Sequence, residues 1–196
     1  AQKDLSRFRK HLAGLSSPSE EQANQLRTFA ERARQEHARN SEIAQARAQR
    51  PLRYGDDIQL QHLRTKQFLS VSPKDRGNLE RTCRQVTLEA GSRRSLFRIN
   101  PHFLHKLLGE RVAFDEQVKL ESVKLQNNWE ISWSKCKNPA KDEVFEVNCA
   151  KGGQGMSFVL YSRSVFLKAG RPGLALNFGL PLTIFMPHFS GYVSSS

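Results

Sequence analysis

Alternation of apolar and polar residues between positions 55 and 71 constrains the fold of this 196-residue chain more than any other feature. Two alternating runs, 58–60 and 68–71, flank the short polar link 62–66. Alternation on both sides of such a link is typical of a half-buried β-hairpin. The stretch therefore predicts two antiparallel strands whose apolar residues face a core.

Short runs with a period of two recur after this hairpin. We expect strands at 57–62, 67–71, 85–89, 95–99, 111–114, 117–121, 129–133, 143–147 and 156–161. Many short strands, separated by glycine and proline at intervals of about ten residues, indicate an all-β barrel or sandwich. The predicted core contains one set of apolar residues: Ile58, Leu60, Phe68, Leu69, Val86, Leu88, Phe97, Ile99, Val118, Leu120, Phe158 and Leu160.

The strand pattern repeats after about 55–60 residues, which favours a trefoil over a sandwich. Residues 57–60 correspond to 117–120, and 96–99 correspond to 157–160. A trefoil needs three such repeats, here called lobes, and only two are clear. The run from Pro181 to Val193 also has the form of an opening hairpin. It closes this trefoil, begins another lobe, or is a remnant of one.

Residues 1–50 have a helical period instead. Leu5, Phe8, Leu12 and Leu15 form one apolar stripe, and a second helix is expected from about 19 to 47, with Ser19 and Gln22 as a capping box. The two helices are expected to pack as a hairpin. It is either a solvated appendage or a subunit-contact arm with an outer face of Arg32, Arg39 and Arg47. The predicted fold is thus mainly β, a β-trefoil-like barrel with an N-terminal α-helical hairpin. Its domains are 1–50, 51–165 and 166–196, the last being C-terminal strands.

The chain is basic, with a formal net charge of +12 spread along its length. A spread excess favours anionic partners without selecting among them. The best candidate for an anion-facing patch contains Arg64, Lys66, Arg81, Arg84, Arg93 and Arg94, with Lys74 and Arg76 nearby in the sequence. Guanidinium groups suit phosphate through forked hydrogen bonds. No nucleic-acid-binding motif accompanies these charges.

Nothing in the sequence indicates an enzyme, a cofactor or a metal site. Cys83, Cys136 and Cys149 are odd in number and widely spaced, so reduced thiols are expected rather than a disulfide framework. His102 and His105 lack further ligands at zinc spacing. The glycines at 152, 153 and 155 are followed by no Lys-Ser/Thr pair, which excludes a P-loop. The apolar stretch 174–193 is long enough for a membrane span, but its prolines favour strands.

The hairpin 55–71 is followed in order by segments at 78–80, 86–91, 95–101, 112–120, 147–149 and 157–160. Their order and spacing resemble the N-terminal trefoil of the inositol trisphosphate receptor and ryanodine receptor calcium-channel family. The basic helical segment at the start resembles the helical arm of that suppressor-type, MIR-like trefoil. In that family a first lobe precedes the arm.

The resemblance implies a regulatory, subunit-contact domain without catalysis, in a tetrameric channel on the cytosolic face of an endoplasmic-reticulum-type membrane. It also implies that inositol trisphosphate binds elsewhere in the parent protein. The alternative is a free-standing trefoil adaptor that binds an acidic protein, a phosphoinositide or nucleic acid.

Overall fold

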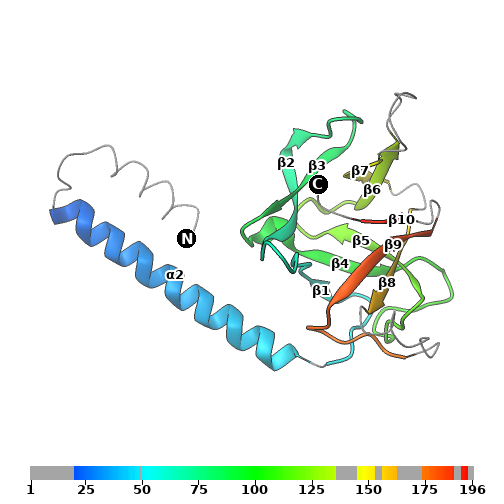
Figure 1. Ribbon diagram of the computed structural model, residues 1–196, viewed down its shortest axis with the longest axis horizontal. Coiled ribbons are helices and arrows are strands. Elements are labelled where there is room, and N and C mark those ends of the chain that lie inside the picture. The colour runs from blue at the N-terminus through cyan, green and yellow to red at the C-terminus, as the bar shows by residue number, and fades with distance from the viewer. Residues whose placement is uncertain are drawn as a thin grey trace. The chain divides into compact units, whose positions relative to one another are not determined.

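The computed structural model describes residues 20–48, 50–135, 145–152, 156–162, 174–187 and 191–193. The chain divides into two compact units, one ending at Gln49 and the other beginning at Arg50. The first unit contains a helix and the second contains the strands (Figure 1).

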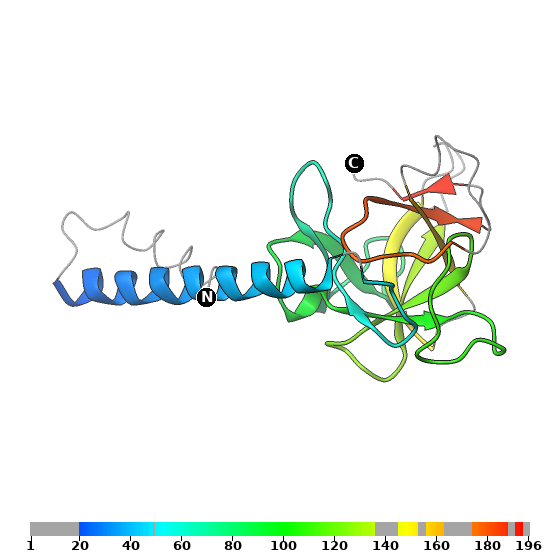
Figure 2. The same ribbon diagram turned by 90° about the horizontal axis from the view of Figure 1, so that it is seen from below.

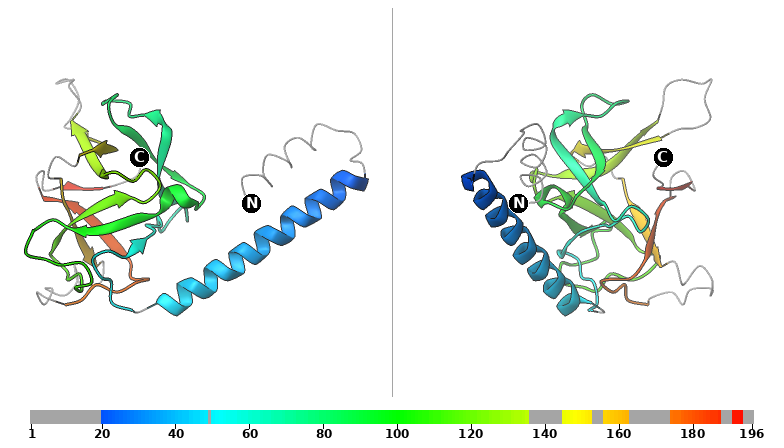
Figure 3. Two further views of the ribbon diagram at one scale, coloured as in Figure 1. Left: turned by 180° about the vertical axis from the view of Figure 1, so that it is seen from behind. Right: turned by 60° about the vertical axis from the view of Figure 1, so that its left-hand side comes forward.

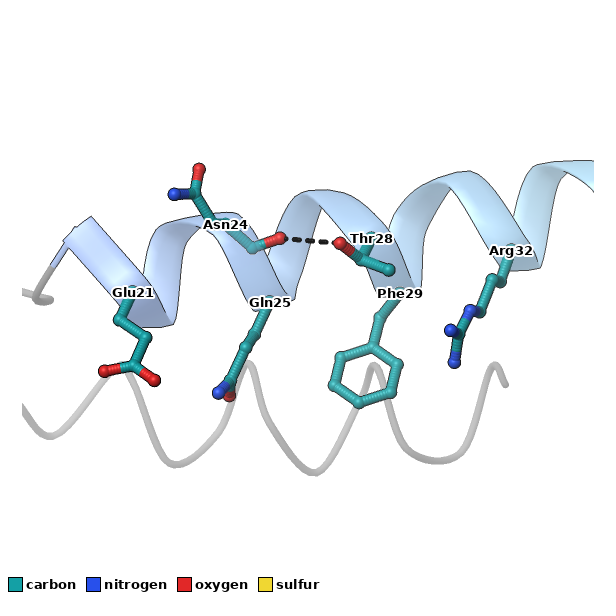
Figure 4. A pocket seen from close by; sticks show the side chains of 6 residues that line it. All are labelled: Glu21, Asn24, Gln25, Thr28, Phe29 and Arg32. Carbon is teal, nitrogen blue, oxygen red and sulfur yellow. Dashed lines mark hydrogen bonds between the residues drawn. The ribbon is translucent and has the colours of Figure 1, made fainter.

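The first unit contains the helix α2, Glu20–Arg47, which agrees with the predicted second helix. Its described side chains are mostly exposed, and Phe29 and Ala30 are half-buried. Figure 4 shows Glu21, Gln25, Phe29 and Arg32 projecting from one side of α2, as steps of three and four residues require. The predicted apolar stripe of Leu5, Phe8, Leu12 and Leu15 lies outside the described residues, so its packing against α2 stays a prediction.

The second unit is one curled antiparallel sheet (Figures 2 and 3). Its main path runs β10-β9-β8-β5-β6-β7-β3-β2, and β4 pairs with both β1 and β5. The strands are β1 (Asp57–Ile58), β2 (Phe68–Arg76), β3 (Arg84–Glu89), β4 (Phe97–Pro101), β5 (Gln117–Ser122), β6 (Trp129–Lys135), β7 (Phe145–Lys151), β8 (Phe158–Ser162), β9 (Leu182–Met186) and β10 (Gly191–Tyr192), with a 3-10 turn η1 at Arg93–Ser95.

A cyclic set of backbone hydrogen bonds joins three distant segments of this unit. The amide of Leu52 donates to the carbonyl of Leu176 at 2.6 Å, that of Val112 to Leu52 at 2.8 Å, and that of Leu176 to Val112 at 2.8 Å. Each segment thus donates to one neighbour and accepts from the other. The three segments thus form a ring with threefold pseudosymmetry, and Leu52, Val112 and Leu176 are its ring residues.

The backbone after the ring turns in the same way in all three lobes. Gly55, Asp115 and Gly179 follow the ring residues at equal distance, and all have a positive φ, of 93°, 70° and 81°. A left-handed conformation suits glycine and is tolerated by aspartate. The third lobe therefore begins near position 174. The sequence made only two lobes clear, and the structure adds the start of a third.

The strand registers repeat with the lobes. Ile99 on β4 lies opposite Leu120 on β5, and Leu160 on β8 lies opposite Ile184 on β9. The predicted C-terminal hairpin is present as β9 and β10, and β9 pairs with β8 in the same sheet. This pairing places residues 182–186 in the same sheet as the strands of the first two lobes.

Several expected strands differ from the structure. Strand β1 covers only Asp57–Ile58 of the expected 57–62, β4 begins at Phe97 after the 3-10 turn rather than at 95, and β7 continues past 147 to Lys151. Residues 111–114 contribute single bridges, Arg53 to Arg111 and Ala113 to Ala175, because this segment belongs to the ring and changes partner after each hydrogen bond. Strand β2 continues past the predicted end at 71 to Arg76, with an irregularity in its pairing between Val71 and Arg76.

The core agrees with the predicted set at most positions. Ile58, Phe97, Ile99, Val118, Leu120, Phe158 and Leu160 are buried. Leu60, Leu69 and Val86 pack against the core but are half-buried, and Phe68 and Leu88 are also half-buried. The predicted core set lacks the buried ring and turn residues Leu52, Tyr54, Val112, Phe114 and Leu176.

Candidate interaction surface

The structure divides the predicted anion-facing patch into two groups at opposite ends of the β2–β3 hairpin. Phe68 pairs with Glu89 at one end and Arg76 with Arg84 at the other. Arg64 and Lys66 precede β2, and Arg93 and Arg94 follow β3, so these four belong to the first end. Arg81 and Arg84, with Lys74 and Arg76, belong to the second. The six residues of the predicted patch therefore do not form one continuous surface.

Arg84 already has partners on β6 and β2. Its guanidinium lies 5.5 Å from the centre of the Trp129 ring, and its Nη1 donates to the carbonyl of Lys74 at 3.3 Å. A stacked, half-buried guanidinium is poorly placed to bind a further anion. Arg64, Lys66, Arg81 and Arg93 are exposed, and Arg94 is half-buried.

The predicted arm arginines all lie on α2 and are exposed. Arg32 and Arg39 are seven residues apart, which places them within about 20° of each other around the helix axis. Arg47 lies about 80° from Arg39 on the same scale. Arg32 projects on the same side of α2 as Phe29 (Figure 4), so this side of α2 is not exclusively polar.

An exposed apolar loop, which the sequence pattern does not predict, follows β4. The exposed fractions are 46% for Phe103, 101% for Leu104, 65% for Leu107 and 70% for Leu108. We call residues 102–110 the apolar loop. Burying one leucine side chain is worth about 1.5–3 kcal/mol. Four large apolar side chains in one short exposed segment therefore favour contact with another protein surface.

Hydrogen bonds at both ends hold the apolar loop against the ring end of the sheet. The amide of Gly109 donates to the carbonyl of Tyr54 at 2.8 Å, and the amide of Tyr54 donates to the carbonyl of Glu110 at 2.9 Å. Arg53 Nη1 donates to the carbonyl of Gly109 at 2.6 Å. At the other end, the amide of His102 donates to the carbonyl of Gln117 at 3.3 Å.

Glu116 fixes the middle of the apolar loop. Its Oε1 accepts from Nζ of Lys106 at 2.5 Å. Its Oε2 accepts from the Tyr54 hydroxyl at 2.9 Å and from the Ala113 amide at 3.0 Å. Lys106 is thereby held inward while Leu104 and Leu107 point to solvent.

These contacts shift the pKa values of all three side chains. Burial opposes ionisation of Glu116, but hydrogen bonds from Ala113, Lys106 and Tyr54 outweigh it and lower the pKa of its carboxyl group. The hydrogen bond to Glu116 raises the pKa of Lys106. Burial, followed by the bond to Glu116, raises the pKa of Tyr54. Glu116 and Lys106 are both charged at neutral pH.

The histidines of the apolar loop take part in ring contacts. Phe103 stacks on His105, with ring centres 5.7 Å apart, and meets His102 edge to face at 4.9 Å. Within the described part of the chain, no group of three or more His, Cys, Asp or Glu residues is arranged to hold a metal ion.

Cys83 and Cys149 are free and buried, and burial raises the pKa of both thiols, to about 12 for Cys149. Cys136 lies outside the described residues.

Comparison with known families decides the assignment. The model described as inositol 1,4,5-trisphosphate/ryanodine receptor matches residues 7–162, which span α2 and the first two lobes. The chain belongs to the inositol 1,4,5-trisphosphate/ryanodine receptor family. The match confirms the resemblance to the N-terminal trefoil of these receptors. The third lobe, from position 174, lies beyond the matched residues.

A solved structure supports the fold of this receptor-family domain. The SDF2-like protein from Arabidopsis thaliana, a MIR-domain protein, aligns with a TM-score of 0.61 and 19% sequence identity. The alignment covers 75% of this chain and 79% of that chain. It confirms the mainly β, trefoil-like fold. In the described part of this receptor-family domain, every helix is too short or too polar to cross a bilayer.

Proposed function

We propose that this chain is a regulatory and subunit-contact domain of an inositol trisphosphate receptor-like calcium-release channel, without catalytic activity. The family assignment supports a receptor context. In this proposal the domain lies on the cytosolic face of an endoplasmic-reticulum-type membrane, as part of a tetrameric channel. It passes conformational signals to its neighbours, and inositol trisphosphate binds elsewhere in the parent protein.

The observation that supports this proposal best is the apolar loop. Phe103, Leu104, Leu107 and Leu108 are exposed on a segment that hydrogen bonds hold at both ends and in the middle. A rigid apolar projection loses little conformational entropy when it docks, so more of its burial energy appears as affinity. Exposed ion pairs from the arm add only about 0–1 kcal/mol each. The loop is therefore the principal contact, and the arm arginines assist encounter and orientation.

The test is the double substitution Leu104→Asp and Leu107→Asp in the parent channel. Both side chains are exposed, so the thermal melt of the isolated domain should change little, while subunit assembly or agonist-evoked calcium release should fall. A matched control is Leu63→Asp with Leu79→Asp, two exposed leucines on other turns of the same unit. Equal effects of the two double variants, or normal release with Leu104→Asp and Leu107→Asp, would contradict the proposal.

A further inference from the structure

Two arginines lie directly opposite each other where the apolar loop ends. Arg53 and Arg111 form an isolated antiparallel bridge. Their neighbours in the sequence make the backbone hydrogen bonds on either side of this bridge, at 2.9 Å and 2.8 Å. The two arginines are therefore a non-hydrogen-bonded pair, the kind of antiparallel pair in which the Cα atoms are closest, at about 4.5 Å.

Both arginine side chains point to solvent. Side chains alternate along an extended backbone, and Arg53 lies between Leu52 and Tyr54, which are 3% and 2% exposed. Arg111 precedes Val112, which is 0% exposed. Arg53 and Arg111 themselves are exposed. Their side chains therefore leave the surface on the same side, with Cβ atoms about 4.5–5.5 Å apart.

The arginine pair is continuous with the apolar loop. Nη1 of Arg53 donates a hydrogen bond to the carbonyl of Gly109 at 2.6 Å. Leu108 lies beside the backbone of Gly55, since a Cβ at that glycine would come within 3.6 Å of Cδ2 of the leucine. A surface that covers Leu108 therefore also comes close to the two guanidinium groups.

The described residues do not neutralise this pair of charges. Asp56 uses its Oδ2 to accept from the backbone amide of Arg53, at 2.9 Å. The ion pairs among the described residues contain other cations, and neither Arg53 nor Arg111 forms one with a described carboxylate. Like charges directly opposite each other destabilise an antiparallel pair. An uncompensated positive pair therefore lies at the edge of the exposed apolar surface.

We propose that Arg53 and Arg111 together bind one carboxylate, an aspartate or glutamate of the neighbouring surface that covers the apolar loop. Guanidinium groups bind carboxylates through forked hydrogen bonds, and two adjacent ones can hold a carboxylate from both sides. Protein interfaces have an apolar centre and a polar rim. Here the apolar loop is the centre and the arginine pair is part of the rim, where it fixes the orientation of docking. This inference rests on the function proposed above and names the chemistry of the partner surface.

Arg111→Glu should change stability and contact in opposite directions. It replaces the repulsion from Arg53 by attraction, so the thermal melt of this chain should rise by about 2 °C. In the assembled parent channel, the same substitution sets a carboxylate against the partner's carboxylate. Photo-crosslinking to the neighbouring subunit from position 104 should therefore fall by about fivefold. Arg81→Glu is the matched control, since Arg81 is exposed at the far end of the β2–β3 hairpin, and it should leave the crosslinking unchanged.

The direct test of a carboxylate partner is Arg111→Lys followed by a water-soluble carbodiimide. The carbodiimide takes up the water that is lost when an amine and a carboxylate condense to an amide, and the arginine of the parent sequence does not react. We expect an amide-linked subunit dimer. Mass spectrometry should locate the link between position 111 and an aspartate or glutamate of the same neighbouring segment that crosslinks to position 104.

The two measurements separate failure of this inference from failure of the proposed function. No product between subunits from a photoreactive label at position 104 would reject the role of the apolar loop, and this inference with it. A product from position 104, together with coupling of Arg111→Lys only to its own subunit, for example to Asp56 or Glu110, would overturn this inference alone. So would a lower thermal melt with Arg111→Glu, or undiminished crosslinking from position 104 in that variant.

Discussion

The Tyr54 hydroxyl donates a hydrogen bond to Oε2 of Glu116 at 2.9 Å, and this bond joins the first lobe to the second. The same carboxylate binds Lys106 of the apolar loop and the Ala113 amide of the ring. One half-buried side chain thus connects the closure of the trefoil to the surface proposed for subunit contact. Its protonation state should therefore influence both stability and loop order.

Glu116→Gln should destabilise the domain by about 2 kcal/mol at neutral pH, because hydrogen bonds to a charged acceptor are lost or weakened. The folded pKa of Glu116 lies below its ordinary value, so its contribution is present above about pH 4.3 and lost as pH falls through the folded pKa. Chemical denaturation of both proteins across pH should show the difference shrinking in acid. A difference independent of pH would contradict the ionised role of Glu116.

Phe97→Ala should cost about 3–5 kcal/mol, the usual cost of truncating a buried aromatic side chain. Phe97 is 0% exposed and lies on β4, between β1 and β5. Chemical denaturation measures the loss. Phe103→Ala is the matched control, since Phe103 lies exposed on the apolar loop and loses only its ring contacts with His102 and His105, so the unfolding free energy should fall far less. An unaltered midpoint for Phe97→Ala would refute the core assignment.

Glu130→Gln should stabilise the domain at neutral pH. Glu130 is 4% exposed, its Oε2 lies 3.8 Å from Nζ of Lys119, and Glu121 stands opposite it in the sheet. Burial, with Glu121 adding to it, raises the pKa of Glu130 despite Lys119. A raised carboxyl pKa penalises the folded state above the folded pKa, and the penalty disappears below the unfolded pKa. Thermal melts should show the largest gain at neutral pH and none in acid; a loss of stability at neutral pH would mean that the Lys119 pair dominates.

The hairpin and the core-facing positions of the first two lobes could be predicted because their apolar residues alternate, as at Ile58, Leu60, Val118 and Leu120. The opening hairpin of the third lobe could be predicted within 181–193, but its assignment stayed open, because the preceding ring segment at Leu176 makes single hydrogen bonds and has no period. The equally spaced Gly55, Asp115 and Gly179 were the available signal.

The apolar loop was missed for a different reason. Its apolar residues follow no period that distinguishes exposed side chains from buried ones. Only the tertiary structure determines which side is faced by Phe103, Leu104, Leu107 and Leu108. The basic residues could be listed from sequence, but their separation to two ends of β2 and β3 depends on strand register. Charge composition alone cannot supply that.

Reversal of Arg32 and Arg39 to Glu should leave the thermal melt of the isolated domain nearly unchanged, because both are exposed on α2. Assembly or gating of the parent channel should weaken, since complementary charge guides encounter and orientation. Arg27→Glu with Arg34→Glu is the matched control, since it changes the same charge on the opposite side of the helix. If the double reversal of Arg32 and Arg39 unfolds the isolated domain, the arm is part of the domain's own folded structure and not a contact surface. Identical effects of both pairs would remove the contact role of this side.

The apolar loop is proposed to touch a neighbouring subunit. The most direct measurement places a photo-crosslinking amino acid at Leu104, which is 101% exposed, in the assembled parent channel. We expect a crosslinked subunit dimer on a denaturing gel, with the loop joined to a different domain of the neighbour and no such product from the same label at Leu63. Crosslinks confined to a single subunit, or equal dimer yields from the two positions, would contradict it.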